Sequence, residues 1–392
     1  MRRIPFCSAL AVLVGAAPAL SDTLAAEIWA EWQAQSALTG QQLSATVTET
    51  DTGLTLTNFA TVGVDEGLES RGELDEIRLI ENADGTLTVE MSPDYRLSFQ
   101  FDDQFSGTNT VTAVARFDGL NISVSGDAGD RTYTYSADQI SVGEVVIDIP
   151  DEEAPELDVT AFVTDLSSTY QIIGTDPATM RFRDETTIGT MVMLFDLIPP
   201  PPEQGRMKVG IQLVGAASNS EGSMITLGGP QVFMDGVPDG LDLQLNTEYE
   251  SFGVEFSLSF EQIFSETLTT VEANYGNEGG ALGMAFSNAA FSYEAAAQGV
   301  EVLFSSSDFP VPVTVNAAET GLAFGMPLEA SDTPQDVIAR INYTDLNLGE
   351  AVWGLFDPTG LIPRDPASIV LDARGQVQLI LDLLNTDLEA LE

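Results

Sequence analysis

The sequence lacks histidine altogether, and it contains one cysteine, Cys7, and one lysine, Lys208. These three residue types supply most of the general bases and nucleophiles that work near neutral pH. Ser-His-Asp, Cys-His and zinc-histidine sites therefore cannot be built. Gly205 stands where the serine of an S-x-x-K nucleophile would precede Lys208. With no P-loop or dinucleotide fingerprint either, the sequence predicts a protein that is not an enzyme and needs no cofactor.

Positive charge is scarce, because 14 Lys and Arg residues stand against 61 Asp and Glu, for a formal net charge of −47. Nucleic acid is excluded as a partner, since phosphate binding needs clustered basic residues. The acidic residues are scattered, which favours a solubility adaptation over a cation store. Asp84, Asp127 and Asp130 lie in glycine-containing turns that offer oxygen ligands for calcium, but no EF-hand loop is complete. Such turns are typical of hairpins, and we expect no metal site.

Long apolar runs are also missing. Arg2 and Arg3 precede an apolar run, Ile4–Val14, followed by small residues. This pattern is typical of a cleaved Sec-type signal peptide occupying residues 1–21, with cleavage near Ala19 or Ser21. We therefore expect a periplasmic protein. No other segment approaches the roughly 20 residues that span a bilayer, so we expect no transmembrane segment in the mature chain.

Outside the leader the chain has no thiol, because Cys7 lies within it, and disulfides cannot stabilise the fold. The mature sequence opens with a predicted helix from Thr23 to about Leu38, ended by Gly40. Trp29 and Trp32 lie on one face of this helix. Their more common role is to anchor a helix on a sheet, and carbohydrate stacking is the alternative.

From Leu43 onward the pattern has a period of two, which predicts strands with one apolar and one polar face. Short turns between the runs indicate antiparallel hairpins and meanders. The fold class we predict is mainly β, a large curved antiparallel sheet forming a groove or open barrel. The clearest strands contain Tyr95-Leu97-Phe99-Phe101 and Phe252-Val254-Phe256-Leu258-Phe260.

A proline-rich spacer, residues 199–204, separates two predicted sheet-rich halves, residues 22–198 and 205–392. A short helix is expected near residues 348–357, followed by a strand at Ser368–Asp372. Because so few helices are available, the apolar sheet face must close on itself, pair with another sheet, or hold an apolar guest.

The candidate binding residues are the aromatic residues of that face, Tyr95, Phe99, Phe101, Phe252, Phe256 and Phe260. Ordinary core packing is their alternative role.

Several stretches of the chain resemble an exported alphaproteobacterial family, the domain-of-unknown-function 2125 family. They are Ala26–Trp32, Leu74–Leu87, Trp353–Pro358 and, after it, Leu361–Ala367. The resemblance covers most of the mature chain and implies periplasmic residence, a β-rich body and a further C-terminal sheet portion. It transfers no catalytic residue, because the family has no assigned activity. More loosely, the alternation is similar to that of AsmA-like envelope proteins, whose long curved sheets are thought to hold lipid in a groove.

These observations favour a non-catalytic envelope protein that binds lipid or an apolar protein segment in a β-groove. Two alternatives stay open. A carboxylate-dependent glycan hydrolase would need two carboxyl groups about 5 to 10 Å apart in a cleft with Trp29 and Trp32 exposed. A structural interaction module would bind another envelope protein along a long open strand edge.

Overall fold

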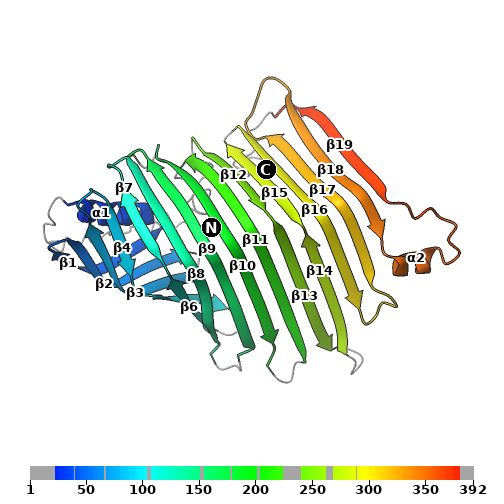
Figure 1. Ribbon diagram of the computed structural model, residues 1–392, viewed down its shortest axis with the longest axis horizontal. Helices are drawn as coiled ribbons and strands as arrows, with labels where there is room; N and C mark the ends of the chain where they lie inside the picture. The colour runs from blue at the N-terminus through cyan, green and yellow to red at the C-terminus, as the bar shows by residue number, and fades with distance from the viewer. Residues whose placement is uncertain are drawn as a thin grey trace, which may run out of the picture.

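The computed structural model describes residues 23–38, 40–65, 68–103, 107–150, 154–176, 179–200, 204–223, 240–261, 268–287 and 289–379. These residues form one antiparallel sheet of 19 strands and two helices. The predicted fold class, a large curved antiparallel sheet with an N-terminal helix and a short helix near the C-terminus, is confirmed (Figure 1).

The helices are α1 (Leu24–Leu38) and α2 (Glu350–Phe356). The strands of the N-terminal part are β1 (Gln41–Thr50), β2 (Gly53–Asp65), β3 (Leu68–Glu81), β4 (Leu87–Met91), β5 (Asp94–Asp103), β6 (Gly107–Asp118), β7 (Asn121–Ser125), β8 (Asp130–Asp148), β9 (Glu156–Ile173) and β10 (Arg181–Ile198). Those of the C-terminal part are β11 (Gly205–Ser223), β12 (Asp242–Tyr249), β13 (Ser251–Glu261), β14 (Leu268–Asn277), β15 (Gly279–Ser287), β16 (Ala290–Ser306), β17 (Val313–Pro327), β18 (Gln335–Leu348) and β19 (Ala367–Val377).

The strands follow one another as an up-and-down meander. Four positions in the sheet are each shared by two short strands, β4 with β5, β7 with β6, β12 with β13, and β15 with β14, so the 19 strands form 15 ribs. With ribs about 4.8 Å apart, the sheet extends about 65 to 70 Å from β1 to β19. The two predicted halves meet where β10 pairs with β11, so one sheet runs through both.

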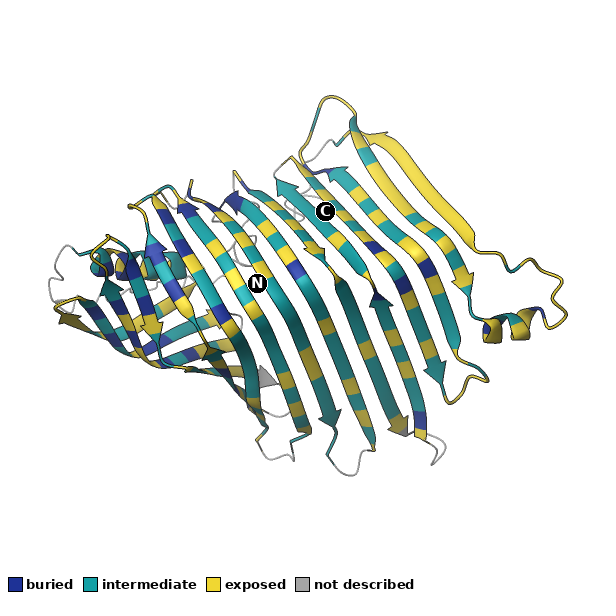
Figure 2. Cartoon of the chain, in the orientation of Figure 1, coloured by how far each residue is buried: buried dark blue, intermediate teal, exposed yellow. Residues whose placement is uncertain are grey.

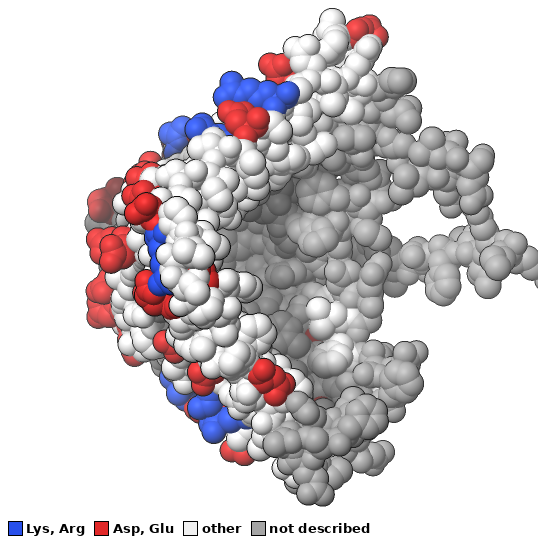
Figure 3. Space-filling model, turned by 90° about the vertical axis from the view of Figure 1, so that its right-hand side faces the viewer, with Lys and Arg blue, Asp and Glu red and all other residues white. Residues whose placement is uncertain are grey.

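Seen along the row of ribs, the sheet is C-shaped, and charged side chains gather on its outer, convex side (Figure 3). Most apolar residues of the alternating strands lie on the inner, concave side. This segregation follows from the two-residue period of the sequence, because successive side chains of a strand point to opposite faces.

Nearly every rib carries one inserted residue at the same level, and we call this line of insertions the seam. In β3, for example, Leu74 and Ile77 are both buried while Asp75 and Glu76 between them are exposed. The strand therefore changes the phase of its alternation by one residue, as at a β-bulge. Register is kept because neighbouring strands insert a residue at the same level. Left-handed backbone occurs along the seam at Asn58, Gly119, Asp165, Gly215, Gly299 and Asp345.

The aromatic residues around β12 and β13 confirm this change of phase. The rings of Tyr249 and Phe252 lie 6.3 Å apart on the same face, although Glu250 and Ser251 separate them in sequence. Asn277 donates hydrogen bonds to the hydroxyl groups of both Tyr249 and Tyr275. Bulges bend strands, so a line of them curves the whole sheet across its ribs.

The main core lies at the N-terminal end, where α1 packs into the concave face of β1 to β3. Ala25, Ile28 and Trp29 of α1 contact buried residues such as Leu56 and Leu79. The second cluster, in β16 and β17, has only three buried members, Ala297, Val300 and Ala317. Figure 2 shows buried residues concentrated at the α1 end and exposed residues along β19.

The predicted helix boundaries agree closely with α1, which Gly40 follows with a φ of 72°. The helix expected near residues 348–357 is α2, and the strand expected at Ser368–Asp372 lies within β19. The predicted signal peptide and part of the proline-rich spacer lie outside the described residues. Neither of the described helices has the length and apolar character needed to cross a membrane.

Candidate functional site: the concave face

Two adjacent rows of directly opposed residues show how strongly the two faces differ. The concave row from β5 to β18 is aliphatic or aromatic throughout: Tyr95, Ala115, Val142, Ala161, Met193, Ile211, Val254, Tyr275, Val302, Val315 and Leu348. The convex row beside it is mostly polar or glycine: Asp94, Arg116, Ser141, Phe162, Val192, Gln212, Gly253, Gly276, Glu301, Asn316 and Asn347. The concave face therefore offers a continuous apolar floor.

All six predicted site residues lie on this concave face and on the same side of the seam. Tyr95, Phe99 and Phe101 belong to β5, and Phe252, Phe256 and Phe260 belong to β13. The two groups are six ribs apart, about 29 Å along the sheet, so they form two places along one groove and not a single pocket. Phe99, Phe101 and Phe260 are 37 to 41% exposed.

A hollow of about 510 Å³, which was not predicted from the sequence, lies beside the C-terminal half of α1. Its walls include Trp32, Leu43, Phe59, Tyr95, Tyr135 and Tyr170. Its volume and its apolar lining are typical of small-molecule sites. Of the predicted residues only Tyr95 reaches it, and its hydroxyl group lies 3.0 Å from the Thr61 hydroxyl. The sequence signal that could have indicated this hollow is the pair Tyr133 and Tyr135, which lie two residues apart in one strand and therefore on the same face.

The tyrosines near this hollow are held in their neutral form. Burial, followed by the charge of Glu31, raises the pKa of Tyr133 to about 12. Burial, followed by the charge of Asp184, raises the pKa of Tyr170 to about 12, and burial also raises the pKa of Tyr135. The surroundings of the hollow are therefore of low polarity, since desolvation disfavours the charged phenolate.

A polar patch lies on the concave face across the seam from the apolar floor. Asp184 accepts hydrogen bonds from the hydroxyl groups of Ser168 and Thr186, each at 2.9 Å. Nearby, the hydroxyl groups of Ser218 and Thr247 lie 3.0 Å apart. On the concave face, the part of the sheet on one side of the seam is therefore apolar, and the part on the other side has a polar centre.

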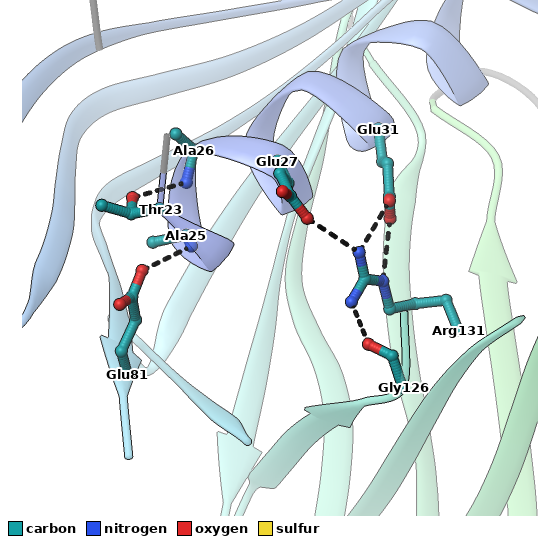
Figure 4. A network of polar contacts seen from close by, with 8 residues as sticks. All are labelled: Thr23, Ala25, Ala26, Glu27, Glu31, Glu81, Gly126 and Arg131. Carbon is teal, nitrogen blue, oxygen red and sulfur yellow. Dashed lines mark hydrogen bonds and ion pairs between the residues drawn. The ribbon is translucent and has the colours of Figure 1, made fainter. Parts of the chain in front are cut away.

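Arg131 is the only basic residue of the described strands that points to the concave side, and it is 2% exposed beneath α1. Its Nη2 and Nε donate to Glu31 at 2.9 and 3.3 Å, Nη2 also reaches Glu27 at 3.4 Å, and Nη1 donates to the Gly126 carbonyl (Figure 4). Although burial opposes the charge, the hydrogen bond to Glu31 and the charge of that carboxylate raise the pKa of Arg131. This arginine is fully engaged in holding α1.

The first turn of α1 is fixed by two further contacts. The side-chain oxygen of Glu81 accepts the Ala25 N–H at 2.8 Å, and the hydroxyl of Thr23 accepts the Ala26 N–H at 3.3 Å (Figure 4). These oxygens satisfy N–H groups that a helix N-terminus leaves without partners. Together with Arg131 they fix α1 in the N-terminal end of the groove.

The turns considered for calcium have ordinary structural roles. The Asp84 carboxylate accepts hydrogen bonds from the hydroxyl and the N–H of Thr86, which lower the pKa of Asp84. Asp130 accepts a hydrogen bond from Gln171 at 2.7 Å. Within the described part of the chain, no three or more Asp, Glu, Cys or His side chains come together as metal ligands would.

No protein-family model, curated protein or solved structure matches the chain.

Proposed function

We propose that this protein is a non-catalytic periplasmic binding protein that holds the hydrocarbon part of an amphiphilic molecule against its concave face. The observation that carries the proposal is the unbroken apolar row from Tyr95 to Leu348, which extends well beyond β1 to β3, the strands that α1 contacts. An acyl chain laid along this row would remove apolar surface from water on both sides of the contact. The aromatic residues of β5 and β13 are the expected contacts at two points of the groove.

The charged residues of the groove also indicate which charge the head group of the amphiphile can carry. Arg131 is engaged by Glu31 and Glu27, and every other basic residue in the described strands points to the convex side. The polar patch offers hydroxyl groups and the carboxylate of Asp184. An uncharged or cationic head therefore fits the patch, whereas an anionic head finds no free basic partner in the described strands and meets a net charge of −47.

The burial of Trp29 favours this proposal over the glycan-hydrolase alternative. That alternative needs both tryptophans on the wall of an accessible cleft, but Trp29 is 4% exposed and packs edge-on against Phe59, with ring centroids 6.2 Å apart. Trp32 is half-buried at the hollow beside α1, where it is better placed to contact an apolar guest.

Two neighbouring residues of β10 provide a matched test. Met193 is 43% exposed on the concave face and Leu194 is 49% exposed on the convex face. Binding of an uncharged fluorescent probe, N-phenyl-1-naphthylamine, is measured for wild type, Met193→Glu and Leu194→Glu. We expect at least tenfold weaker binding for Met193→Glu, because a carboxylate must be desolvated there, and unchanged binding for Leu194→Glu. Equal binding by all three proteins would refute the proposal.

The head is tested by competition among three amphiphiles with the same twelve-carbon chain. Dodecyl maltoside and dodecyltrimethylammonium, used below their critical micelle concentrations, should displace the probe at least tenfold more effectively than dodecanoate. Asp184→Asn should reduce the advantage of the cationic compound and leave that of the maltoside unchanged. Preferential displacement by dodecanoate would show that the head has been assigned wrongly.

A further inference from the structure

Among the described strands, β19 forms one edge of the sheet. All of its residues from Ala367 to Val377 are exposed (Figure 2), and its one paired neighbour among the described strands is β18. Exposed edges usually carry devices that prevent pairing, such as prolines, short length or bulges. β19 has 11 residues, contains no proline, and keeps one register with β18 from Gln335–Val377 to Tyr343–Ile369.

The concave side of β19 is apolar, whereas its convex side carries one apolar residue among polar ones. Ile369 and Leu371 lie on the concave side opposite Tyr343 and Ile341, and are 40% and 60% exposed. Val370 lies on the convex side and is 59% exposed. The opposite edge, β1, has the sequence QQLSATVTET, which is mainly threonine, glutamine and other polar residues. The two edges therefore present different surfaces to a partner.

The two charged residues of β19 are complementary to a second copy of the same strand. Asp372 and Arg374 lie on the convex side and form a bidentate pair within the strand, at 2.9 and 3.0 Å. If two β19 strands run antiparallel with Ala373 opposite Ala373, each Asp372 stands directly opposite the partner's Arg374. Oppositely charged residues directly opposed across an antiparallel pair are stabilising.

The same register also fits the concave side. Leu371 stands opposite Gly375, where an added β-carbon would have nothing within 4 Å, and Ile369 stands opposite Val377. Each large side chain thus meets a small or apolar one. The exposed main-chain groups of the edge find partners at the same time.

We propose that two copies of this protein associate through β19, antiparallel about Ala373, with a two-fold axis perpendicular to the sheet. Such an axis keeps both concave faces on the same side of the joined sheet. The seams of the two copies lie on opposite sides of the axis, because the seam meets β19 near Ser368 and not at Ala373. The ends that carry α1 lie farthest from the axis. The interface is isologous and closes after two copies, as in most homodimers. This inference does not depend on what the groove binds.

Sedimentation equilibrium with charge-reversal variants tests the dimer. We expect wild type to reach twice the monomer mass, and Arg374→Asp and Asp372→Arg each to weaken the dimer about tenfold or more, since each places like charges opposite one another twice. The double variant Asp372→Arg/Arg374→Asp should restore association. A wild-type protein that stays monomeric, forms larger concentration-dependent assemblies, or dimerises regardless of these changes would overturn the proposal.

A cysteine at the two-fold axis gives a readout that is independent of charge. In a Cys7→Ser background, Ala373→Cys should form a disulfide-linked dimer under mild oxidation, because directly opposed residues of antiparallel strands lie within disulfide range. Thr46→Cys in β1 is the control and should stay unlinked. Cross-linking through Thr46→Cys, or none through Ala373→Cys, would show that β19 does not pair with itself.

Discussion

The two ends of the sheet share one rib architecture but differ in what covers their concave faces. At the N-terminal end α1 fills the groove, and residues such as Ile28, Leu56 and Leu87 have no exposed surface. At the C-terminal end the corresponding face carries Phe304, Phe324 and other large apolar side chains that are more than a third exposed. The difference shows that the sheet can form without a filled groove, because its strands already pair on both sides. The C-terminal end, whose concave face α1 does not fill, is therefore the end proposed to receive a guest.

Alkaline pH should unfold the filled end first. Tyr133 and Tyr170 have pKa values raised from 10 to about 12, so the unfolded chain loses their protons before the folded protein does. Their stabilisation is complete below pH 10 and is lost as the pH rises to about 12, a total of about 5 kcal/mol for the pair. Tyrosinate absorbance and helix content should change together in this window. In the double variant Tyr133→Phe/Tyr170→Phe the loss should be smaller by the share of these two tyrosines, and a remainder is expected because burial also raises the pKa of Tyr135. Persistence of the full loss would contradict this assignment.

Removing the cation beneath α1 should have the next largest effect. Arg131→Ala leaves the carboxylate of Glu31 half-buried without its partner, and we expect the free energy of unfolding to fall by about 3 to 5 kcal/mol. Arg116→Ala is the matched control, because Arg116 is half exposed while it pairs with Asp94 and Glu144, and its loss should cost less than about 1 kcal/mol. Urea unfolding measures both. Equal costs would mean that α1 is not held by Arg131.

Truncating one apolar side chain at each end tests the comparison directly. Leu56→Ala should destabilise the protein by about 3 kcal/mol, because it opens a cavity in the filled core. Phe304→Ala should cost about 1 kcal/mol, since Phe304 is 37% exposed and its neighbours already face an open groove. Chemical denaturation gives both values. A cost at Phe304 as large as that at Leu56 would indicate that the C-terminal groove is also filled.

Replacing a glycine of the seam by alanine should lower the free energy of unfolding by a similar amount at both ends of the sheet. We expect this loss to be smaller than that for Leu56→Ala. Gly119 and Gly299 have φ values of 63° and 58°, and an added β-carbon would meet the side chains of Asp138 and Glu278. Alanine at either position should cost about 1 to 2 kcal/mol, because left-handed backbone disfavours residues with a β-carbon. Gly276→Ala, with open space around the added atom, should be close to neutral. Thermal unfolding distinguishes these cases, and a neutral Gly299→Ala would show that the seam tolerates side chains there.

Much of the fold was predictable because alternation is a local signal. The strands containing Tyr95 and Phe252 and the helix ended by Gly40 could all be read from the sequence. The seam was not predicted, although its signal is present as pairs of consecutive polar residues, such as Asp75-Glu76 and Glu250-Ser251, inside apolar alternation. A single such pair resembles an ordinary turn. Only the pairing of strands shows that all of them fall on one line.

The candidate site was predictable only in part, for a similar reason. The six aromatic residues share one face of the sheet, as the two-residue period implies, but sequence gives no measure of the distance between β5 and β13. The hollow beside α1 brings together residues from α1 and from strands as distant in sequence as β1 and β9. The role of Arg131 also depends on a contact with Glu31, which is 100 residues away. Neither arrangement has a local signature.

Because of the seam, the cross-section of the groove and the length of the groove are determined by different features of the chain. Because each rib carries its own bend, the width and depth of the cross-section are determined within a single strand. The number of ribs determines only how far that cross-section is repeated. Inserting one further hairpin with a bend at the same level would lengthen the channel by about 10 Å and leave its profile unchanged. Such modular growth would change the length of the apolar floor without altering the residues that shape its cross-section.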